Sequence, residues 1–320
     1  MNTDSLAING GPKAAENLGP FPTKIGKDEL LQVLDLWQFS DGTMQKIQDL
    51  IKKDKDVKGP HLFRYYNPRP SKVAAAEKAM KEFIGTDYCI GMNSCTSTLI
   101  AAYRSLGIGM GDEVIVPAYT FFATSATVVS CNAIPVIADV DDTLCLDPEA
   151  VEKAITPRTK AIVPVHMRGG PAQMDGIMDV ANKHGIPVIE DTAQAAGGSF
   201  GGKMLGSIGT IGCFSFDYYK VIVSGEGGFF TTNDKRLYTR ALNWHDCAAC
   251  WRPDRFGPEQ ENEELFCGEN YRMSELEGAV ALAQINKAKD IVEKHNAAKK
   301  RIKDAIEDFP GLSYRRIADE

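Results

Sequence analysis

Short apolar runs alternate with segments of helical period through the middle of the chain, between residues 88 and 190. The apolar runs have the length of buried strands, and after each one apolar residues recur every three or four positions. Strands that alternate with helices predict right-handed crossovers and an α/β fold with a mostly parallel central sheet, covered by helices on both faces. The expected strands cover 88–92, 113–117, 135–140, 161–167 and 187–190, and the expected helices cover 96–106, 121–130, 148–155 and 174–184.

The regions on either side have different patterns. The first 60 residues contain several Gly and Pro breakers and one segment of helical period, which predicts a helix over 28–37. A second helix, over 71–84, leads into the alternating region. Polar, irregular sequence over 243–267 predicts a long loop, and a strong helical pattern follows over 275–307. Charged residues fill 52–58, which we interpret as a solvated surface.

These patterns divide the chain into three parts. Residues 1–60 form an irregular and helical N-terminal segment, and 61–270 form a large α/β domain. Residues 271–320 form a linking helix and the start of a smaller C-terminal domain, with a strand beginning over 312–315. Because a lone strand cannot bury itself, we expect this smaller domain to be truncated in the chain.

Composition narrows the classes of protein. Of the 320 residues, 43% are hydrophobic and 25% are charged, which is ordinary for a globular protein. The net charge of −7 without a basic stripe argues against nucleic-acid binding. No apolar run is long enough for a membrane span, and the N-terminus has no signal-peptide core. Eight cysteines without a framework spacing indicate a reducing compartment, so we expect a cytoplasmic protein.

A candidate nucleophile lies between two β-prone runs. The first run ends at Ser215, Lys220 follows among apolar neighbours, and a glycine-rich turn at 225–228 precedes the second run. A desolvated lysine can attack a carbonyl carbon near neutral pH, and a serine at a strand end can bind phosphate. An exposed lysine beside a turn would have the same local pattern, so these residues alone leave both interpretations open.

An acid completes a possible cofactor site. Asp191 and Gln194 follow the apolar strand pattern over 187–190, at the sheet edge where open α/β folds place their ligands. A lysine and an acid aimed into one crevice suit pyridoxal phosphate, because the amine forms an imine while the acid keeps the ring nitrogen protonated. Gln194 could bind the ring's phenolic oxygen. The alternatives are that Asp191 caps the next element and that Gln194 binds a loop carbonyl.

Two further predicted strands end at the same edge of the sheet as the strand that precedes Asp191. The run of serine, cysteine and threonine over 94–98, including Cys95 and Thr96, opens a helix and can bind an anion through backbone N–H groups. Ordinary N-capping is the alternative for that run. Phe121 could stack on a pyridine ring or could be a core residue.

The chain resembles the DegT/DnrJ/StrS family of pyridoxal phosphate-dependent sugar aminotransferases, which have fold type I, from about residue 59 to residue 284. The lysine block of that family is matched by Ser215, Lys220 and the turn at 225–228, and its E-D-x-A-Q block by 190–194. The resemblance implies that Asp191 pairs with the pyridine nitrogen and that Gln194 lies near the phenolic oxygen.

Other blocks of the family follow in the same order. Its Ser-Gly-Thr phosphate turn corresponds to 94–96, with Cys95 in place of the usual glycine, so the backbone there must accept a Cβ atom. The P-x-x-T-F segment is matched over 117–121 and places Phe121 over the ring. The N-Y-R-M-[ST] block is matched over 270–274, where the resemblance implies that Asn270 reaches the phosphate of the neighbouring subunit's cofactor. A homodimer with shared active sites follows from that role.

The resemblance implies a transaminase that transfers an amino group from glutamate or glutamine to a keto-sugar or keto-cyclitol in amino-sugar biosynthesis. Lys220 and Asp191 are the expected catalytic residues. Residues 6–12 are similar to inosose aminotransferases, whereas 141–167 are similar to the 8-amino-octulosonate transaminase, so the substrate stays open. The alternatives are a non-catalytic or regulatory protein that binds pyridoxal phosphate, and a sugar dehydratase. Lys220 argues against the dehydratase, because the known dehydratases of the family carry histidine there.

One other motif deserves a separate interpretation. Cys247 and Cys250 are spaced like zinc ligands, with His245 and Cys267 nearby. No second cysteine pair completes a four-ligand set at the usual spacing, so we expect no metal site. The role of these two cysteines stays open.

Overall fold

The computed structural model describes residues 25–54, 62, 71–248 and 267–319. The chain forms two compact units, Met1–His61 and Leu62–Glu320. The predicted domain boundaries, which give segments 1–60, 61–270 and 271–320, stay predictions. None of the helices in the described part of the chain is long and apolar enough to span a bilayer.

The first unit contains helices α1 (Lys27–Asp35) and α2 (Asp41–Lys53). The Lys27 ammonium donates to the carbonyl of Ile51 at 2.6 Å and so joins the two helices. Helix α2 begins after Ser40, whose side chain accepts from the Thr43 N–H, a common N-cap. The sequence prediction missed α2, because charged residues over 52–58 were interpreted only as solvated surface. The first of those residues form the last turn of α2, where lysines interact favourably with the helix dipole.

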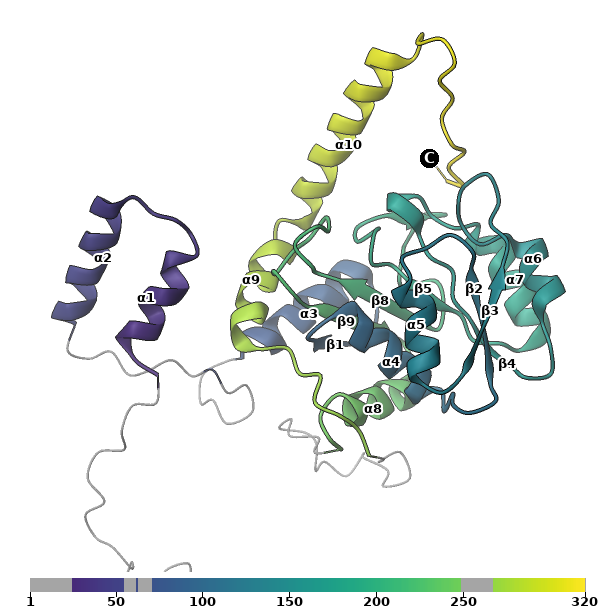
Figure 1. Cartoon of the computed structure of the whole chain (residues 1–320), viewed down its shortest axis with the longest axis horizontal. Coiled ribbons are helices and arrows are strands. Elements are labelled where there is room, and N and C mark those ends of the chain that lie inside the picture. Colours follow the sequence, from purple (N-terminus) through teal and green to yellow (C-terminus); the bar gives the residue numbers. More distant parts are fainter. Residues whose placement is uncertain (1–24, 55–61, 63–70, 249–266, 320) are drawn as a thin grey trace, which may run out of the picture. The chain divides into compact units, whose positions relative to one another are not determined.

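The second unit is built on a four-stranded and a three-stranded group of β-strands, with helices around them (Figure 1). Two groups of strands, in the orders β1-β9-β8-β5 and β3-β2-β4, are joined by a parallel bridge between Val188 and Ile162. Only β9 runs antiparallel to its neighbours, so the prediction of a mostly parallel sheet is confirmed. The strands are β1 (Tyr88–Met92), β2 (Glu113–Pro117), β3 (Ile134–Ala138), β4 (Thr159–Ile162), β5 (Ile189–Asp191), β8 (Ile211–Ser215) and β9 (Gly228–Thr232).

Helices cover both faces of the sheet. A hydrophobic core lies on each face of the sheet, and successive residues of β2 point into different cores. Val114 and Val116 pack with α4 and α8, whereas Ile115 packs with α6 and α7. The other face of β1 and β9 is covered by α3 and α9. The helices are α3 (Lys72–Ile84), α4 (Cys95–Ser105), α5 (Ala123–Ser130), α6 (Pro148–Ala154), α7 (Met174–His184), α8 (Lys235–Trp244), α9 (Glu275–Ile285) and α10 (Ala288–Ile306).

The C-terminal part differs from the prediction in two ways. The single helix expected over 275–307 is two helices, because Lys287 donates its N–H to Gln284 in a tighter turn between α9 and α10. The strand expected over 312–315 is wrong, since this segment is irregular. It is held by hydrogen bonds to loops rather than by a sheet: the Arg315 guanidinium donates to the carbonyl of Thr143 at 3.2 Å.

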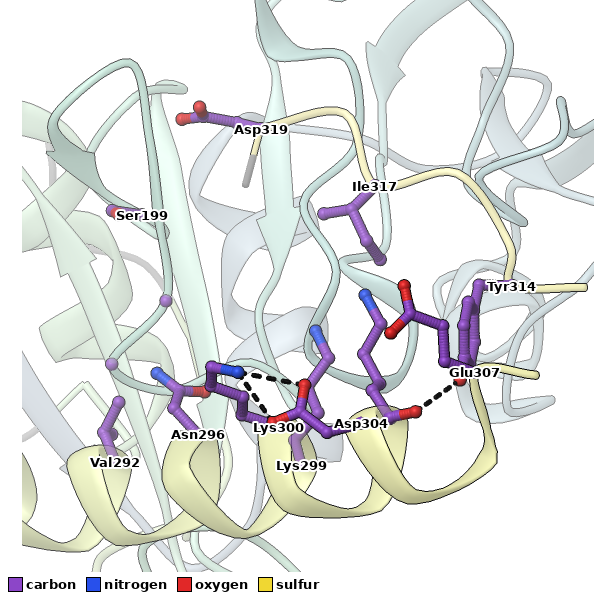
Figure 2. Close-up of a pocket in the computed structure, with 13 residues that line it drawn as sticks. Ser199, Val292, Asn296, Lys299, Lys300, Asp304, Glu307, Tyr314, Ile317 and Asp319 are labelled. Carbon is purple, nitrogen blue, oxygen red and sulfur yellow. Dashed lines mark hydrogen bonds and ion pairs between the residues drawn. The ribbon is translucent and has the colours of Figure 1, made fainter.

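A cavity of about 750 Å³ lies between α10, residues 197–199 and this C-terminal segment. Figure 2 shows the side chains of Asn296 and Lys299 on α10, with Ile317 and Asp319 on the segment that closes the cavity. Asp319 accepts from the N–H of Gly201, next to the short strands β6 (Ser199–Phe200) and β7 (Lys203–Met204). Three lysines and three acidic residues line the cavity. Their charges therefore do not add up to an electrostatic potential of one sign that would attract a charged ligand.

Candidate active site

A second cavity, of about 470 Å³, opens at the carboxyl ends of β5 and β8 on the face covered by α4 and α5. Open α/β sheets bind ligands at this edge. The cavity brings together seven of the eight predicted site residues, which come from four segments of the chain. They are Cys95, Thr96, Phe121, Asp191, Gln194, Ser215 and Lys220.

Asp191 is the last residue of β5 and is buried at the base of this cavity. Its Oδ2 accepts from the Thr124 hydroxyl at 2.9 Å, and its Oδ1 accepts from the Ala193 N–H at 3.2 Å. Burial raises the pKa of Asp191 above its usual value, while these two hydrogen bonds and the positive charge of Lys220 act in the opposite direction. The carboxylate is therefore desolvated but has a donor on each oxygen.

Gln194 is oriented by the turn at Met167–Gly169. The N–H of Arg168 donates to Gln194 Oε1 at 3.1 Å, and Arg168 adopts the left-handed conformation with φ of +51°. The amide nitrogen of Gln194 lies 3.4 Å from Met167 Sδ, a weak acceptor. Gln194 can therefore donate a hydrogen bond to a ligand in the cavity.

The N-terminus of α4 supplies an anion site. Ser94 caps the helix by accepting from the Ser97 N–H, and Thr96 is exposed at the first turn. The Cys95 thiol is buried and lies 3.7 Å from the Thr98 hydroxyl. Burial raises the pKa of this thiol well above its ordinary value, so Cys95 stays neutral.

Strand β9 approaches α4 closely at Gly228. A Cβ atom at this position would lie 2.5 Å from the carbonyl of Ser94 and 2.6 Å from the N–H nitrogen of Cys95. Gly228 also pairs with Ser215 across β8 and β9, which puts the Ser215 hydroxyl beside the helix N-terminus. The helix dipole and two hydroxyls, from Thr96 and Ser215, therefore surround one position that suits a phosphate.

Lys220 lies in the turn between β8 and β9 and is half-buried. Its N–H donates to the carbonyl of Asp217 at 3.0 Å, and the Asp217 carboxylate accepts from the N–H of Tyr219. These bonds hold the turn so that the lysine faces the same cavity as Asp191. A rigid turn limits the positions that the Lys220 amine can adopt.

Two of the predicted site residues, Phe121 and Asn270, are less closely associated with the cavity than the others. Phe121 lines the cavity, but 62% of its surface is exposed, so the described chain does not bury it as a core residue. Asn270 is exposed and does not line this cavity; it forms an antiparallel bridge with Asp246. The role expected for Asn270 concerns a neighbouring subunit and stays a prediction.

Sequence reasoning missed the threonines behind Asp191. Thr120 lines the cavity, and its hydroxyl lies 2.9 Å from that of Thr124, which in turn contacts Asp191. The available signal was the pair of threonines at the start of the helix predicted over 121–130; Thr120 precedes α5 and Thr124 lies in its first turn. The signal is weak, since threonines at such positions are common.

The described residues contain no group of three or more His, Cys, Asp or Glu that could hold a metal ion. Cys247 is exposed, whereas Cys250 lies outside the described residues. The zinc interpretation of that pair is therefore untested.

The residues of the cavity fit pyridoxal phosphate. Lys220 would offer the amine, Asp191 would offer the acid for a ring nitrogen, and the start of α4 would offer backbone N–H groups for a phosphate. The volume of about 470 Å³ suits a small cofactor with a substrate. The neutral thiol of Cys95 puts no negative charge beneath the phosphate.

Known proteins match most of the chain. The model of the DegT/DnrJ/EryC1/StrS aminotransferase family covers residues 68–320. The spore coat polysaccharide biosynthesis protein SpsC of Bacillus subtilis is 38% identical over 78% of this chain and 65% of its own length. The L-glutamine:2-deoxy-scyllo-inosose aminotransferase of Streptoalloteichus tenebrarius is 40% identical over 68% of this chain and 51% of its own length.

A solved structure agrees with these matches. The aminotransferase from Psychrobacter cryohalolentis superposes with a TM-score of 0.71 and is 36% identical over 77% of this chain and 64% of its own. This chain therefore spans about half to two thirds of the length of these proteins. The predicted fold type I is confirmed. The chain belongs to the DegT/DnrJ/EryC1/StrS aminotransferase family, and its cofactor is pyridoxal phosphate.

Proposed function

We propose that this chain carries the cofactor-binding part of an aminotransferase that transfers an amino group from glutamine or glutamate to a keto-sugar or keto-cyclitol. The observation that supports this most is the meeting of Lys220 and Asp191 in one cavity beside the N-terminus of α4. Relatives named as inosose aminotransferases and as a GDP-perosamine synthase support a polyhydroxylated keto substrate.

Each residue has a defined task in this proposal. Bound pyridoxal phosphate supplies the carbonyl that receives the amino group and the ring that takes up electrons. Lys220 Nζ would hold the cofactor at its carbonyl carbon, with the carbonyl oxygen leaving as water, and the free amine would move the proton from the α-carbon of the donor. The Asp191 carboxylate holds the proton on the ring nitrogen. Gln194 donates to the phenolic oxygen, and Phe121 stacks on the ring.

The phosphate is held by hydroxyls and by the helix. Thr96, Ser215 and the N–H groups at Cys95 bind its oxygens, with the positive end of the α4 dipole behind them. The proposal includes a homodimer in which Asn270 of one protomer reaches the phosphate bound by the other. We place the protein in the cytoplasm, which is supported by the eight cysteines of the sequence, whose spacing forms no disulfide framework.

The first experiment is a visible spectrum of the purified protein with pyridoxal phosphate, before and after addition of glutamine or glutamate. We expect an absorption band that depends on Lys220, that is lost on adding the donor, and that a suitable keto substrate restores. The matched control is Lys203→Ala, which removes an exposed lysine from β7. A band that survives Lys220→Ala and ignores every donor would contradict transamination and favour a binding or regulatory role.

Mixing two inactive variants tests the shared site. In a heterodimer of Lys220→Ala and Asn270→Ala, one site carries both substitutions and the other carries none. Random reassociation should therefore restore about a quarter of the wild-type activity. If Asn270 acts within its own subunit, both sites of the heterodimer are defective and no activity returns.

A further inference from the structure

Two threonine hydroxyls connect the wall of the cofactor cavity with the carboxylate of Asp191. Thr120 Oγ1 lies 2.9 Å from Thr124 Oγ1, and Thr124 Oγ1 lies 2.9 Å from Asp191 Oδ2. Thr124 is 1% exposed and Asp191 is 5% exposed, so water does not compete for these contacts. Both threonines belong to the segment that enters α5, whereas Asp191 ends β5.

The direction of these hydrogen bonds follows from the number of available protons. An ionised carboxylate only accepts, so the Thr124 hydroxyl must donate to Asp191. A hydroxyl has one hydrogen, and Thr124 therefore cannot donate to the carbonyl of Phe121, 3.2 Å away, at the same time. Thr120 must then donate to Thr124. In this arrangement both oxygens of the ionised Asp191 carboxylate accept a hydrogen bond, from the Thr124 hydroxyl and from the Ala193 N–H.

Asp191 needs this support because it is desolvated. Burial raises the pKa of Asp191, and the Thr124 hydroxyl is the largest influence in the opposite direction, followed by the Ala193 N–H. The other titratable groups around the carboxylate are Lys220 and His166, whose positive forms favour its ionisation. Cys95, Cys213 and Tyr103 also interact with it, and burial raises the pKa of all three groups so that they stay neutral.

We propose that Thr124 is a positioning residue of the cofactor site, which keeps Asp191 ionised and aimed at the ring nitrogen, and that Thr120 fixes the direction of the Thr124 hydroxyl. This inference rests on the proposed function, in which Asp191 holds the ring proton. Thr124 does not line the cavity. Its effect passes through Asp191 alone.

The test compares Thr124→Val, which keeps the shape and removes the hydroxyl, with Thr124→Ser, which keeps the hydroxyl. The matched control is Thr127→Val, since Thr127 is also buried in α5 and its hydroxyl donates to the Ala123 carbonyl at 2.8 Å. The readouts are the dissociation constant of pyridoxal phosphate and the pH titration of its visible absorbance, and thermal melting checks that each variant folds.

We expect Thr124→Val to weaken cofactor binding about tenfold and to move the acidic limb of the titration to higher pH, because a hydrogen bond to a charged group is lost. Thr124→Ser and Thr127→Val should stay within about threefold of wild type, a change of less than 1 kcal/mol. In an Asp191→Asn background Thr124→Val should cause no further loss.

Other outcomes separate this inference from the proposed function. An unchanged Thr124→Val, or an equal loss in Thr127→Val, overturns the positioning role even if the wild type transaminates. A wild type that binds no pyridoxal phosphate overturns the proposed function, and the inference with it.

Discussion

Glu190 illustrates how a single buried side chain joins several segments behind the cofactor site. Its carboxylate is fully buried and accepts from the N–H groups of Gly206, Ile208 and Gly209 at 2.6–2.8 Å. His166 Nε2 lies 3.0 Å from the same carboxylate, while His166 Nδ1 accepts from the Ala172 N–H. Glu190 therefore connects two loops with the strand that carries Asp191.

We expect Glu190→Gln to destabilise the fold by about 1–3 kcal/mol, because an amide group would turn a donor toward backbone N–H groups that need an acceptor. Urea unfolding of the two proteins measures the difference. Glu149→Gln is the control: Glu149 is exposed on α6, and its replacement should change stability by about 0.5 kcal/mol or less. Equal stability of wild type and Glu190→Gln would refute the structural role of the carboxylate.

The residue scale also explains which parts of the site the sequence could predict. Lys220 and Asp191 are recognisable because few residue types perform their chemistry and because strand ends precede them. Thr124 and Glu190 depend on contacts with residues that are distant in sequence, and a hydroxyl or carboxylate at those positions has many ordinary uses. The hydrogen-bond partners of Thr124 and Glu190 can be identified only in the folded structure, where β5, α5 and the loop before β8 lie side by side.

At the scale of elements, the contact between β9 and α4 builds the phosphate site. Gly228→Ala would put a methyl group 2.5 Å from the Ser94 carbonyl, so the strand and the helix start would have to separate. Overpacking of this kind costs about 1–3 kcal/mol, and we expect cofactor affinity to fall at least about tenfold. Equilibrium titration with pyridoxal phosphate measures the change.

The control for this substitution is Gly109→Ala. Its added methyl group would meet only Arg104 Nη1, at 3.9 Å, and its backbone conformation does not require glycine. Cofactor affinity of this variant should match the wild type. If Gly228→Ala binds the cofactor as tightly as the control, the close approach of β9 is not needed for the phosphate site.

The sequence predicted the order of strands and helices in the α/β region, where apolar runs such as β2 are fully buried. The bounds agree less well: the strand expected over 161–167 is β4 (Thr159–Ile162). Helix α8 was missed, because its strongly polar sequence buries only a few side chains, among them Leu237 and Leu242. A strand was predicted over 312–315, but no neighbouring strand pairs with this segment among the described residues. A segment becomes a strand when a neighbouring strand pairs with it, and the local sequence pattern does not show whether such a neighbour exists.

In the second unit as a whole, ion pairs connect the C-terminal segment with the loop that follows β3. Arg316 donates to Asp142 at 2.7 Å and to Asp141 at 3.0 Å. Burial alone would raise the pKa of Asp141, but hydrogen bonds from Thr143 and Gln173 hold the pKa below its usual value. Ionised Asp141 therefore stabilises the folded unit.

The lowered pKa of Asp141 in the folded state sets the direction in which the free energy of unfolding changes with pH. An acid with a lowered pKa in the folded state contributes stability above its unfolded pKa, about 3.9, and loses it as the pH falls through the folded value. The difference in unfolding free energy between wild type and Asp141→Asn should be constant from neutral pH to about pH 4 and shrink below that. Urea unfolding across this range measures it, with Asp87→Asn as an exposed control. A difference that grows on acidification would contradict the sign.

The position of β9 has a consequence for how the protein is made. Strand β1 has β9 as its neighbour in the sheet, and Tyr88 pairs with Thr232. On the ribosome, β1 leaves the exit tunnel well before its partner has been synthesised, so the nascent chain carries an unpaired strand edge with Ile90 and Met92 uncovered. Such long-range pairing is slow. Translation speed and chaperone supply, more than any local substitution in β1, should set the yield of folded protein.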